Sequence, residues 1–206
     1  MNYLFIRCYE KDDYLARLCF ESWMIAGFKG HVFFYTEKYP YKWIMGTTAI
    51  IKEREYCNNF GGQLGANALM DGFRKIKFHD QDVIISCDSD VVIKNNPLDD
   101  FKEDFGGRGG MNEHGFIHLS GQLLMIRGWV LNEVLNDLPG QIYQFWNKMV
   151  KDGIDVADDL YLSCRISKIP GVTTHIYSHY WLHDKPYHLE PRTDWGRIVE
   201  ETKTIQ

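Results

Sequence analysis

The sequence has no long apolar run, no paired-cysteine motif and little imbalance of charge. None of its apolar stretches approaches the roughly 20 residues of a membrane-spanning helix, and the N-terminus lacks the basic and apolar regions of a signal peptide. The net charge is −5, without the basic excess that is typical of nucleic-acid-binding proteins. Internal repeats and low-complexity tracts are also missing. We therefore expect a cytoplasmic globular protein without a transmembrane segment.

The cysteines are too few and too scattered to suggest a disulfide framework or a structural zinc site. They are odd in number, and no two of them form a C-x-x-C pair. Free thiols buried in a reducing compartment are the simplest interpretation. The residues concerned are Cys8, Cys19, Cys57, Cys87 and Cys164.

The order of the predicted elements favours an α/β fold. Apolar runs at 3–8, 31–35 and 83–85 predict buried strands, and helical periodicity over 13–26 and 63–77 predicts helices between them. This β-α-β order predicts a mainly parallel central sheet flanked by helices, in a single domain over 1–206. The other predicted elements are strands at 47–51 and 122–126, helices marked by 142–150 and 155–166, and a β-branched, aromatic tail from 173 onward.

Glycines at 106, 107, 109 and 110 predict a mobile loop. Such a loop could close over a bound ligand and exclude water, although a surface loop without that role is an open alternative.

The strand at 83–85 leads directly into the pattern Asp88-Ser89-Asp90. On extended backbone, side chains two residues apart point the same way, so the two carboxylates converge past the carboxyl end of a buried strand. Adjacent carboxylates repel unless a cation neutralises them, and Mg²⁺ or Mn²⁺ suits oxygen ligands of this kind. The pattern therefore predicts a divalent metal site, with two solvated aspartates in a turn as the plain structural alternative.

Histidines at 175, 179 and 183 are spaced by four residues. On a helix this spacing suggests a zinc site, but the neighbouring β-branched and aromatic residues favour strand or irregular structure. A single histidine could instead complete the site begun by Asp88 and Asp90.

The segment from His179 to Tyr187 resembles the H-x-x-G-x-x-K-P-W signature of glycosyltransferase family 8. Ser120-Gly121 before an apolar strand resembles the N-[AS]-G segment of that family, and the segment from Asp158 to Ser163 is similar to its D-Q-x-x-L-N segment. The resemblance implies the GT-A fold, a D-x-D motif that binds Mn²⁺, and transfer of a sugar from a UDP-sugar to a hydroxyl acceptor with retention of configuration.

The resemblance also implies roles for individual residues. The metal ligands would be Asp88, Asp90 and His179. The first two residues of the D-Q-x-x-L-N-like segment face the reacting sugar, which makes Asp158 and Asp159 the candidate catalytic residues; they could orient the acceptor hydroxyl, or accept its proton if the reaction inverts. The candidate donor-binding residues are Arg7, Tyr9, Arg74, Asp88, Ser89, Ser120, Gly121 and Lys185. The segment 173–206 would close the metal and donor site.

Other functions fit the residues as well. A sugar nucleotidyltransferase would normally carry G-x-G-x-R near the N-terminus, where this chain has Arg7-Cys8-Tyr9-Glu10. A non-catalytic sugar-binding module and a zinc hydrolase built on the histidines stay open. The sequence does not select the acceptor, which could be a saccharide, a lipid-linked glycan, a protein or a hydroxymethylated DNA base, and it does not indicate an oligomeric state.

Overall fold

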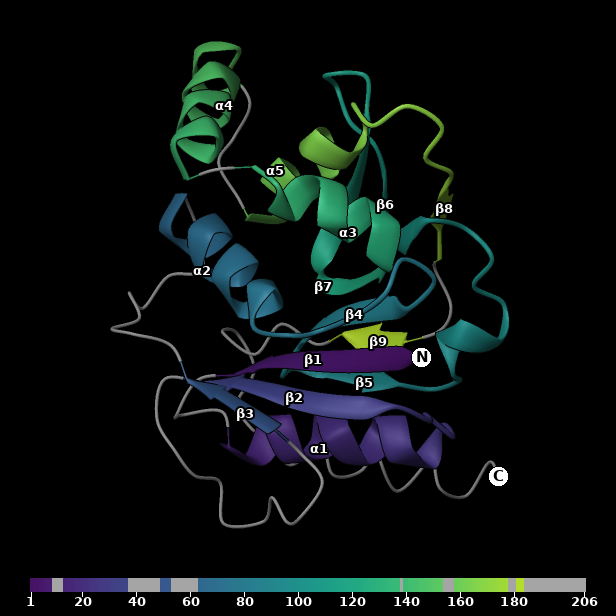
Figure 1. Cartoon of the computed structure of the whole chain (residues 1–206). Coiled ribbons are helices and arrows are strands. Elements are labelled where there is room, and N and C mark those ends of the chain that lie inside the picture. Colours follow the sequence, from purple (N-terminus) through teal and green to yellow (C-terminus); the bar gives the residue numbers. More distant parts are fainter. Residues whose placement is uncertain are drawn as a thin grey trace.

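The protein is built around a seven-stranded sheet with helices on both faces (Figure 1). The computed structural model describes residues 1–8, 13–36, 49–52, 63–137, 139–153, 158–177 and 181–183. The strands are β1 (Asn2–Cys8), β2 (His31–Thr36), β3 (Ala49–Lys52), β4 (Val83–Asp88), β5 (Val91–Ile93), β6 (Phe105–Met111), β7 (Ile117–Arg127), β8 (Thr174–Ile176) and β9 (Trp181–His183). The helices are α1 (Asp13–Ile25), α2 (Gln63–Arg74), α3 (Gly128–Leu135), α4 (Pro139–Lys151), α5 (Asp158–Ile166) and the 3-10 turn η2 (Pro97–Asp99).

The strand order in the large sheet is β3-β2-β1-β4-β7-β6-β8. The first four strands of this order pair in parallel, and β6 pairs in parallel with β8. Only β7, which lies between β4 and β6, runs antiparallel to its neighbours. The prediction of a mainly parallel sheet flanked by helices is therefore confirmed, and β4 occupies the centre of the sheet.

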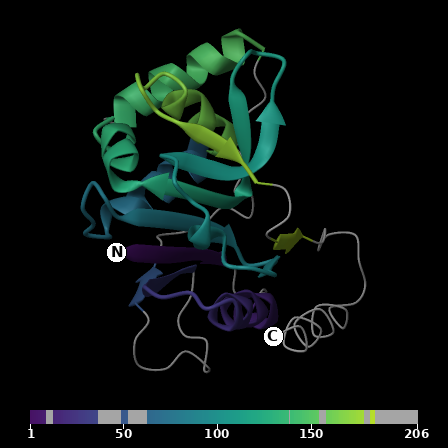
Figure 2. The same cartoon turned by 90° about the vertical axis from the view of Figure 1, so that its right-hand side faces the viewer.

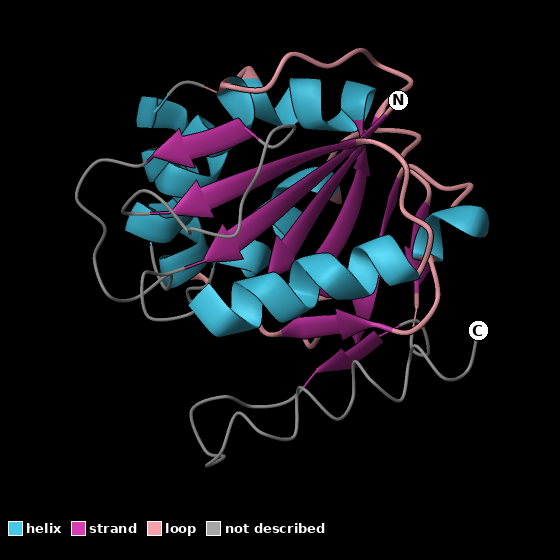
Figure 3. Cartoon of the chain, turned by 90° about the horizontal axis from the view of Figure 1, so that it is seen from below, coloured by secondary structure: helices cyan, strands magenta, loops and turns pink. Residues whose placement is uncertain are grey.

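Alternating side chains of the central strands divide the core into two layers. Phe5 and Ile84 pack with α2, α3 and α5, whereas Leu4 and Ile85 pack with α1 on the other face. Figure 3, seen from below, shows α1 lying across this second face. All four side chains are fully buried, and burying each stabilises the fold by roughly 1.5–3 kcal/mol. Burial on both faces explains why these strands have apolar runs instead of an apolar-polar alternation.

Helix boundaries follow the local sequence signals in most places. Gly27, with φ of +82°, ends the first helix as predicted, because a left-handed backbone position favours glycine. The second helix ends at Arg74, earlier than the periodicity predicts. Helix α3 was not predicted, since it is short and Arg127 at its N-cap makes no side-chain capping hydrogen bond. None of the helices in the described ranges is long and apolar enough to cross a membrane.

The prediction of a mobile glycine loop at 106–110 is wrong. These residues belong to β6, which pairs with both β7 and β8 (Figure 2). A Cβ on Gly109 would lie 1.9 Å from the His118 carbonyl oxygen, and one on Gly107 would lie 2.6 Å from the Leu123 carbonyl oxygen. The glycines therefore allow two strands to approach closely at an irregular point of the ladder.

Four cysteines lie within the described residues, and all four are free and buried, as predicted. The thiols of Cys19 and Cys87 lie 3.7 Å apart, between α1 and β4. Burial raises the pKa of the Cys19 thiol well above its usual value, as does the neighbouring Cys87 thiol, so it stays protonated. Cys57 lies outside the described residues.

The helical zinc interpretation of the histidine tail is wrong. His175 belongs to β8 and His183 to β9, so imidazoles spaced by four do not share a helix face. Strand β9 pairs with β5 in a separate two-stranded sheet, with His183 opposite Val91. In the described parts of the tail, β8 and β9, the strand structure that its β-branched and aromatic residues favour is therefore present.

Candidate active site

The carboxyl ends of β1 and β4 meet where the order of the parallel strands reverses. From β1 the chain builds outward to β2 and β3, and then returns to place β4 on the opposite side of β1. Open α/β sheets bind their ligands at such a switch point. Arg7 and Asp88 are paired in register there, and the Ser89 N–H donates to the Arg7 carbonyl oxygen at 3.0 Å.

The Arg7 guanidinium connects three strands at this edge. Its Nη2 atom lies 2.6 Å from Asp88 Oδ1 and donates to the Gly121 carbonyl oxygen at 2.7 Å. The Arg7 side chain is only 4% exposed, whereas the Asp88 side chain is 33% exposed. The buried cation therefore fixes the carboxylate of β4 while leaving part of that carboxylate open to the surface.

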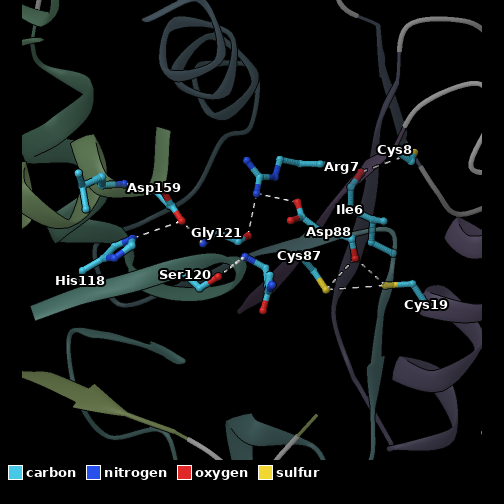
Figure 4. A network of polar contacts seen from close by, with 12 residues as sticks. Ile6, Arg7, Cys8, Cys19, Cys87, Asp88, His118, Ser120, Gly121 and Asp159 are labelled. Carbon is cyan, nitrogen blue, oxygen red and sulfur yellow. Dashed lines mark hydrogen bonds and ion pairs between the residues drawn. The ribbon is translucent and has the colours of Figure 1, made fainter. Parts of the chain in front are cut away.

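Gly121 lies between two charged side chains (Figure 4). Its carbonyl oxygen accepts from Arg7, and its N–H donates to Asp159 Oδ2 at 2.8 Å. A Cβ at this position would lie 2.9 Å from Arg7 Nη2 and 3.2 Å from the Asp159 Cβ. A side chain here would require the buried guanidinium to shift, which favours glycine at this position.

Asp159 is the second residue of α5, where the helix dipole favours a negative charge. Its Oδ1 atom accepts from the Leu160 N–H at 2.7 Å, and its Oδ2 atom lies 3.4 Å from His118 Nε2. Burial alone raises the pKa of the Asp159 carboxyl, but His118, the Gly121 N–H and Arg7 together bring it below its ordinary value. The group is therefore an ionised carboxylate at neutral pH.

Two of the three predicted metal ligands, Asp88 and Asp90, are among the residues that the structure describes. Asp88 ends β4 and Asp90 follows in the turn before β5, so the two carboxylates share the carboxyl edge of the central strand. Their oxygen atoms are the hard ligands that Mg²⁺ and Mn²⁺ prefer, and the donor set fits such an ion. Among the residues that the structure describes, no three His, Cys, Asp or Glu side chains gather as a complete site. His179, the third predicted ligand, lies outside those residues.

The structure does not bring Arg74 to this site. Its guanidinium binds Asp71 at 2.8 Å and the carbonyl oxygens of Leu135 and Asp137 at 3.3 and 2.9 Å. The prediction that Arg74 contacts the donor is therefore not supported by the geometry. The side chain instead satisfies carbonyl groups at the C-terminal end of α3, where a cation is favourable.

Three of the other predicted site residues, Ser89, Ser120 and Asp158, are among those that the structure describes. Ser89 is buried in the turn after β4, and Ser120 precedes Gly121 on β7, with its Oγ accepting from the Gln122 N–H at 3.4 Å. Asp158 is the first residue of α5. Tyr9 and Lys185 lie outside the described residues.

His118 was missed by sequence reasoning. It lies on β7, three residues before Gly121. Its imidazole and the Gly121 N–H both approach the Oδ2 atom of Asp159 (Figure 4). Nothing in the local sequence around His118 indicates this contact. Only its position beside the predicted Ser120-Gly121 segment could have drawn attention to it.

Two solved structures with a similar fold are glycosyltransferases. The galactosyltransferase LgtC, in complex with donor and acceptor sugar analogs, matches with a TM-score of 0.57 and 13% identity, over 100% of this chain and 96% of LgtC. The glycosyltransferase GlyE of Streptococcus pneumoniae TIGR4 matches with a TM-score of 0.53 and 12% identity, over 84% of this chain and 44% of GlyE. No protein-family model and no curated protein matches the sequence. At these identities the likeness establishes the fold, and the chain has the GT-A-like fold that the resemblance implied.

Proposed function

We propose that this protein is a metal-dependent glycosyltransferase that moves a sugar from a nucleoside diphosphate donor, a UDP-sugar, to a hydroxyl acceptor. The observation that carries the proposal is the Arg7–Asp88 pair, followed by Asp90, at the switch point of a GT-A-like sheet. Glycosyltransferase neighbours support the general reaction class. The donor, the metal requirement and the retention of configuration come from the residues and their family resemblance.

The charge of the site explains why a cation belongs to the proposal. Among the residues of this edge that the structure describes, the carboxylates of Asp88, Asp90 and Asp159 outnumber the guanidinium of Arg7, so their charge alone would repel an anionic diphosphate. A divalent ion held by Asp88, Asp90 and His179 would offset the negative charge that builds on the diphosphate as the glycosidic bond breaks. Arg7 holds the Asp88 carboxylate in position for binding.

Several residues of the chain would act on the substrates directly. Lys185 and Tyr9 would contact the diphosphate and the base of the donor. Ser120 and Gly121 would line the sugar and acceptor site, next to Asp158 and Asp159 at the start of α5. With this arrangement the chain's residues bind the donor at the β1–β4 edge and orient the acceptor from the β7–α5 side.

Calorimetry with UDP tests the donor site directly. We expect UDP to bind in the presence of Mn²⁺ and to bind at least tenfold more weakly after EDTA treatment. Asp90→Asn should reproduce the effect of EDTA, whereas the matched control Asp99→Asn should not, because Asp99 is an exposed carboxylate on η2. Equal UDP affinity with and without the metal would refute the metal requirement.

A second comparison concerns the histidine ligand. The resemblance selects His179, whereas the β5–β9 register puts His183 opposite Val91, the residue after Asp90. We expect His179→Ala to weaken Mn²⁺-dependent UDP binding more than His183→Ala. The reverse order would transfer the ligand role to His183.

NMR of the product anomer with the unmodified enzyme tests whether the configuration is retained. A product of inverted configuration would contradict that part of the proposal.

A further inference from the structure

His118 is the last residue in a series of polar contacts that begins at Asp88 and passes through Arg7, Gly121 and Asp159. Its Nε2 atom is buried and lies 3.4 Å from Asp159 Oδ2, while the side chain as a whole is 34% exposed. The separation is long for a hydrogen bond, so the contact is mainly electrostatic in this state. Catalytic contacts of this kind are often long without substrate and shorten when it binds. With Nε2 facing the carboxylate, Nδ1 is the nitrogen left to meet a substrate.

Asp159 is poorly suited to removing a proton itself. Its carboxylate already accepts the backbone N–H groups of Gly121 and Leu160, at 2.8 and 2.7 Å. Hydrogen bonds to the ionised form make a carboxylate a weaker base. The side chain is also only 17% exposed, so a substrate hydroxyl has limited access to it. The arrangement instead suits a group that holds and orients a neighbouring imidazole.

We infer that His118 accepts the proton of the acceptor hydroxyl and that Asp159 is a positioning residue for its imidazole; this inference rests on the proposed function. The acceptor oxygen forms a bond to the anomeric carbon on the same face from which the diphosphate oxygen leaves, as the bond from that carbon to the diphosphate oxygen breaks, so the configuration is retained. The electron pair of the broken bond leaves with the nucleoside diphosphate. The hydroxyl proton passes to Nδ1 of His118, and the imidazolium faces the Asp159 carboxylate until it releases the proton to solvent.

The placement of His118 relative to the donor edge supports this role. Gly121 is bonded to Asp159 through its N–H and to Arg7 through its carbonyl oxygen, and Arg7 is bonded to Asp88. His118 of β7 and Arg7 of β1 both interact electrostatically with the Asp159 carboxylate of α5. The Asp159 Oδ2 atom, 3.4 Å from Nε2, is the negative charge beside the imidazolium that forms as the hydroxyl is deprotonated.

The test compares two histidines of the same hairpin. His118→Gln removes the proton acceptor, and His114→Gln is the matched control, since His114 lies in the β6–β7 turn with its Nε2 atom 3.6 Å from the exposed Glu113 carboxylate. The assay measures UDP release from UDP-galactose and UDP-glucose with Mn²⁺, with water as the acceptor, from pH 5 to 9. UDP affinity is measured by calorimetry for each variant.

We expect His118→Gln to lower the rate of UDP release at least about 100-fold while its UDP affinity stays within threefold of the unmodified enzyme. The fall in rate on acidification, present in the unmodified enzyme and in His114→Gln, should disappear in His118→Gln, because a protonated imidazole cannot accept a proton. Asp159→Asn should lower the rate of UDP release while UDP affinity stays within threefold of the unmodified enzyme, because the imidazole then lacks the carboxylate that orients it.

Five results would overturn the inference. A normal rate for His118→Gln would exclude a proton-accepting role, and an unchanged acid limb in that variant would assign the titration to another group. UDP affinity that falls as much as the rate would make His118 a donor-binding residue. If the unmodified protein binds UDP but releases none from either donor, the inference fails and the donor site stands. If it binds no UDP with Mn²⁺, the proposed function fails, and the inference fails with it.

Discussion

The buried ion pair between Arg7 and Asp88 provides a direct test of how the site is held together. Arg7→Met keeps the aliphatic stem of the side chain but removes the guanidinium, and with it the ion pair to Asp88 Oδ1 and the hydrogen bond to the Gly121 carbonyl oxygen. The substitution removes the cationic partner of a half-buried carboxylate and one donor to a backbone carbonyl group. We therefore expect a lower free energy of unfolding and a weaker Mn²⁺-dependent affinity for UDP.

The size of the effect follows from the burial of the two partners. Removing one partner of a buried ion pair costs about 3–5 kcal/mol, because the other charge is left without compensation. Asp88 is 33% exposed, so water recovers part of that cost, and we expect a loss of about 2–4 kcal/mol. The methionine side chain keeps most of the packing, which limits any contribution from a cavity.

The chain contains a matched control on its surface. Arg17 lies 2.8 Å from Glu21 on α1, which is close to the 2.6 Å of the Arg7–Asp88 pair, but its side chain is 54% exposed. Arg17→Met should cost no more than about 0.5 kcal/mol, as is usual for exposed pairs. Urea unfolding followed by circular dichroism measures both variants.

The comparison has a clear refuting outcome. If the losses for Arg7→Met and Arg17→Met agree within about 0.5 kcal/mol, burial does not strengthen the Arg7 pair and the reasoning fails. A double-mutant cycle refines the result, because Arg7→Met should cost less in an Asp88→Asn background, where the ion pair is already absent.

Three further predictions concern the elements around the site. Gly121→Ala should destabilise the protein by about 1–3 kcal/mol, because its Cβ would meet a buried guanidinium at 2.9 Å, whereas Gly110→Ala should be nearly neutral, since no atom lies within 4 Å there; urea unfolding separates them. Ser163→Ala should cost about 1–3 kcal/mol in the same assay, because it leaves the buried N–H and carbonyl groups of Leu119 without their hydroxyl partner. Burial alone raises the pKa of Asp104, but donors from α3 and the segment before β8 bring it below its ordinary value, so its stabilising contribution is present above the unfolded pKa of about 3.9 and is lost as pH falls further. Asp104→Asn should therefore flatten the acid end of a plot of unfolding free energy against pH, and an unchanged acid limb would contradict this assignment.

Much of the fold could be predicted from local patterns. The apolar runs of β1 and β4 are buried on both faces, so their composition alone indicated central parallel strands. The position of Asp88 after such a strand indicated that it lies at the carboxyl edge of the sheet, where β4 ends in the structure. What the patterns could not supply was the partner of each strand beyond the β-α-β units, including the antiparallel β7 and the helix α3 that follows it.

The glycine segment shows why the remaining predictions failed. A glycine is required either where the backbone needs a conformation that other residues rarely adopt, or where a neighbouring backbone segment leaves no room for a Cβ. The sequence looks the same in both cases. Gly109 belongs to the second kind, because the His118 carbonyl oxygen occupies the place of a side chain. Similarly, two helices separate His118 from Asp159 in the sequence, and the packing of α5 against β7 brings the two side chains together.

The irregular pairing of β6 with β7 accounts for the geometry of the site itself. Gly107 pairs with Leu124 and Gly109 with Leu119, so the β7 residues between Leu119 and Leu124 face a single residue of β6. The regular ladder is interrupted there, and Gly121 uses its N–H and carbonyl oxygen for Asp159 and Arg7 instead. Bulges are common beside active sites because they redirect backbone groups in this way. The close approach that glycines permit in β6 therefore also determines where the two charged side chains meet on β7.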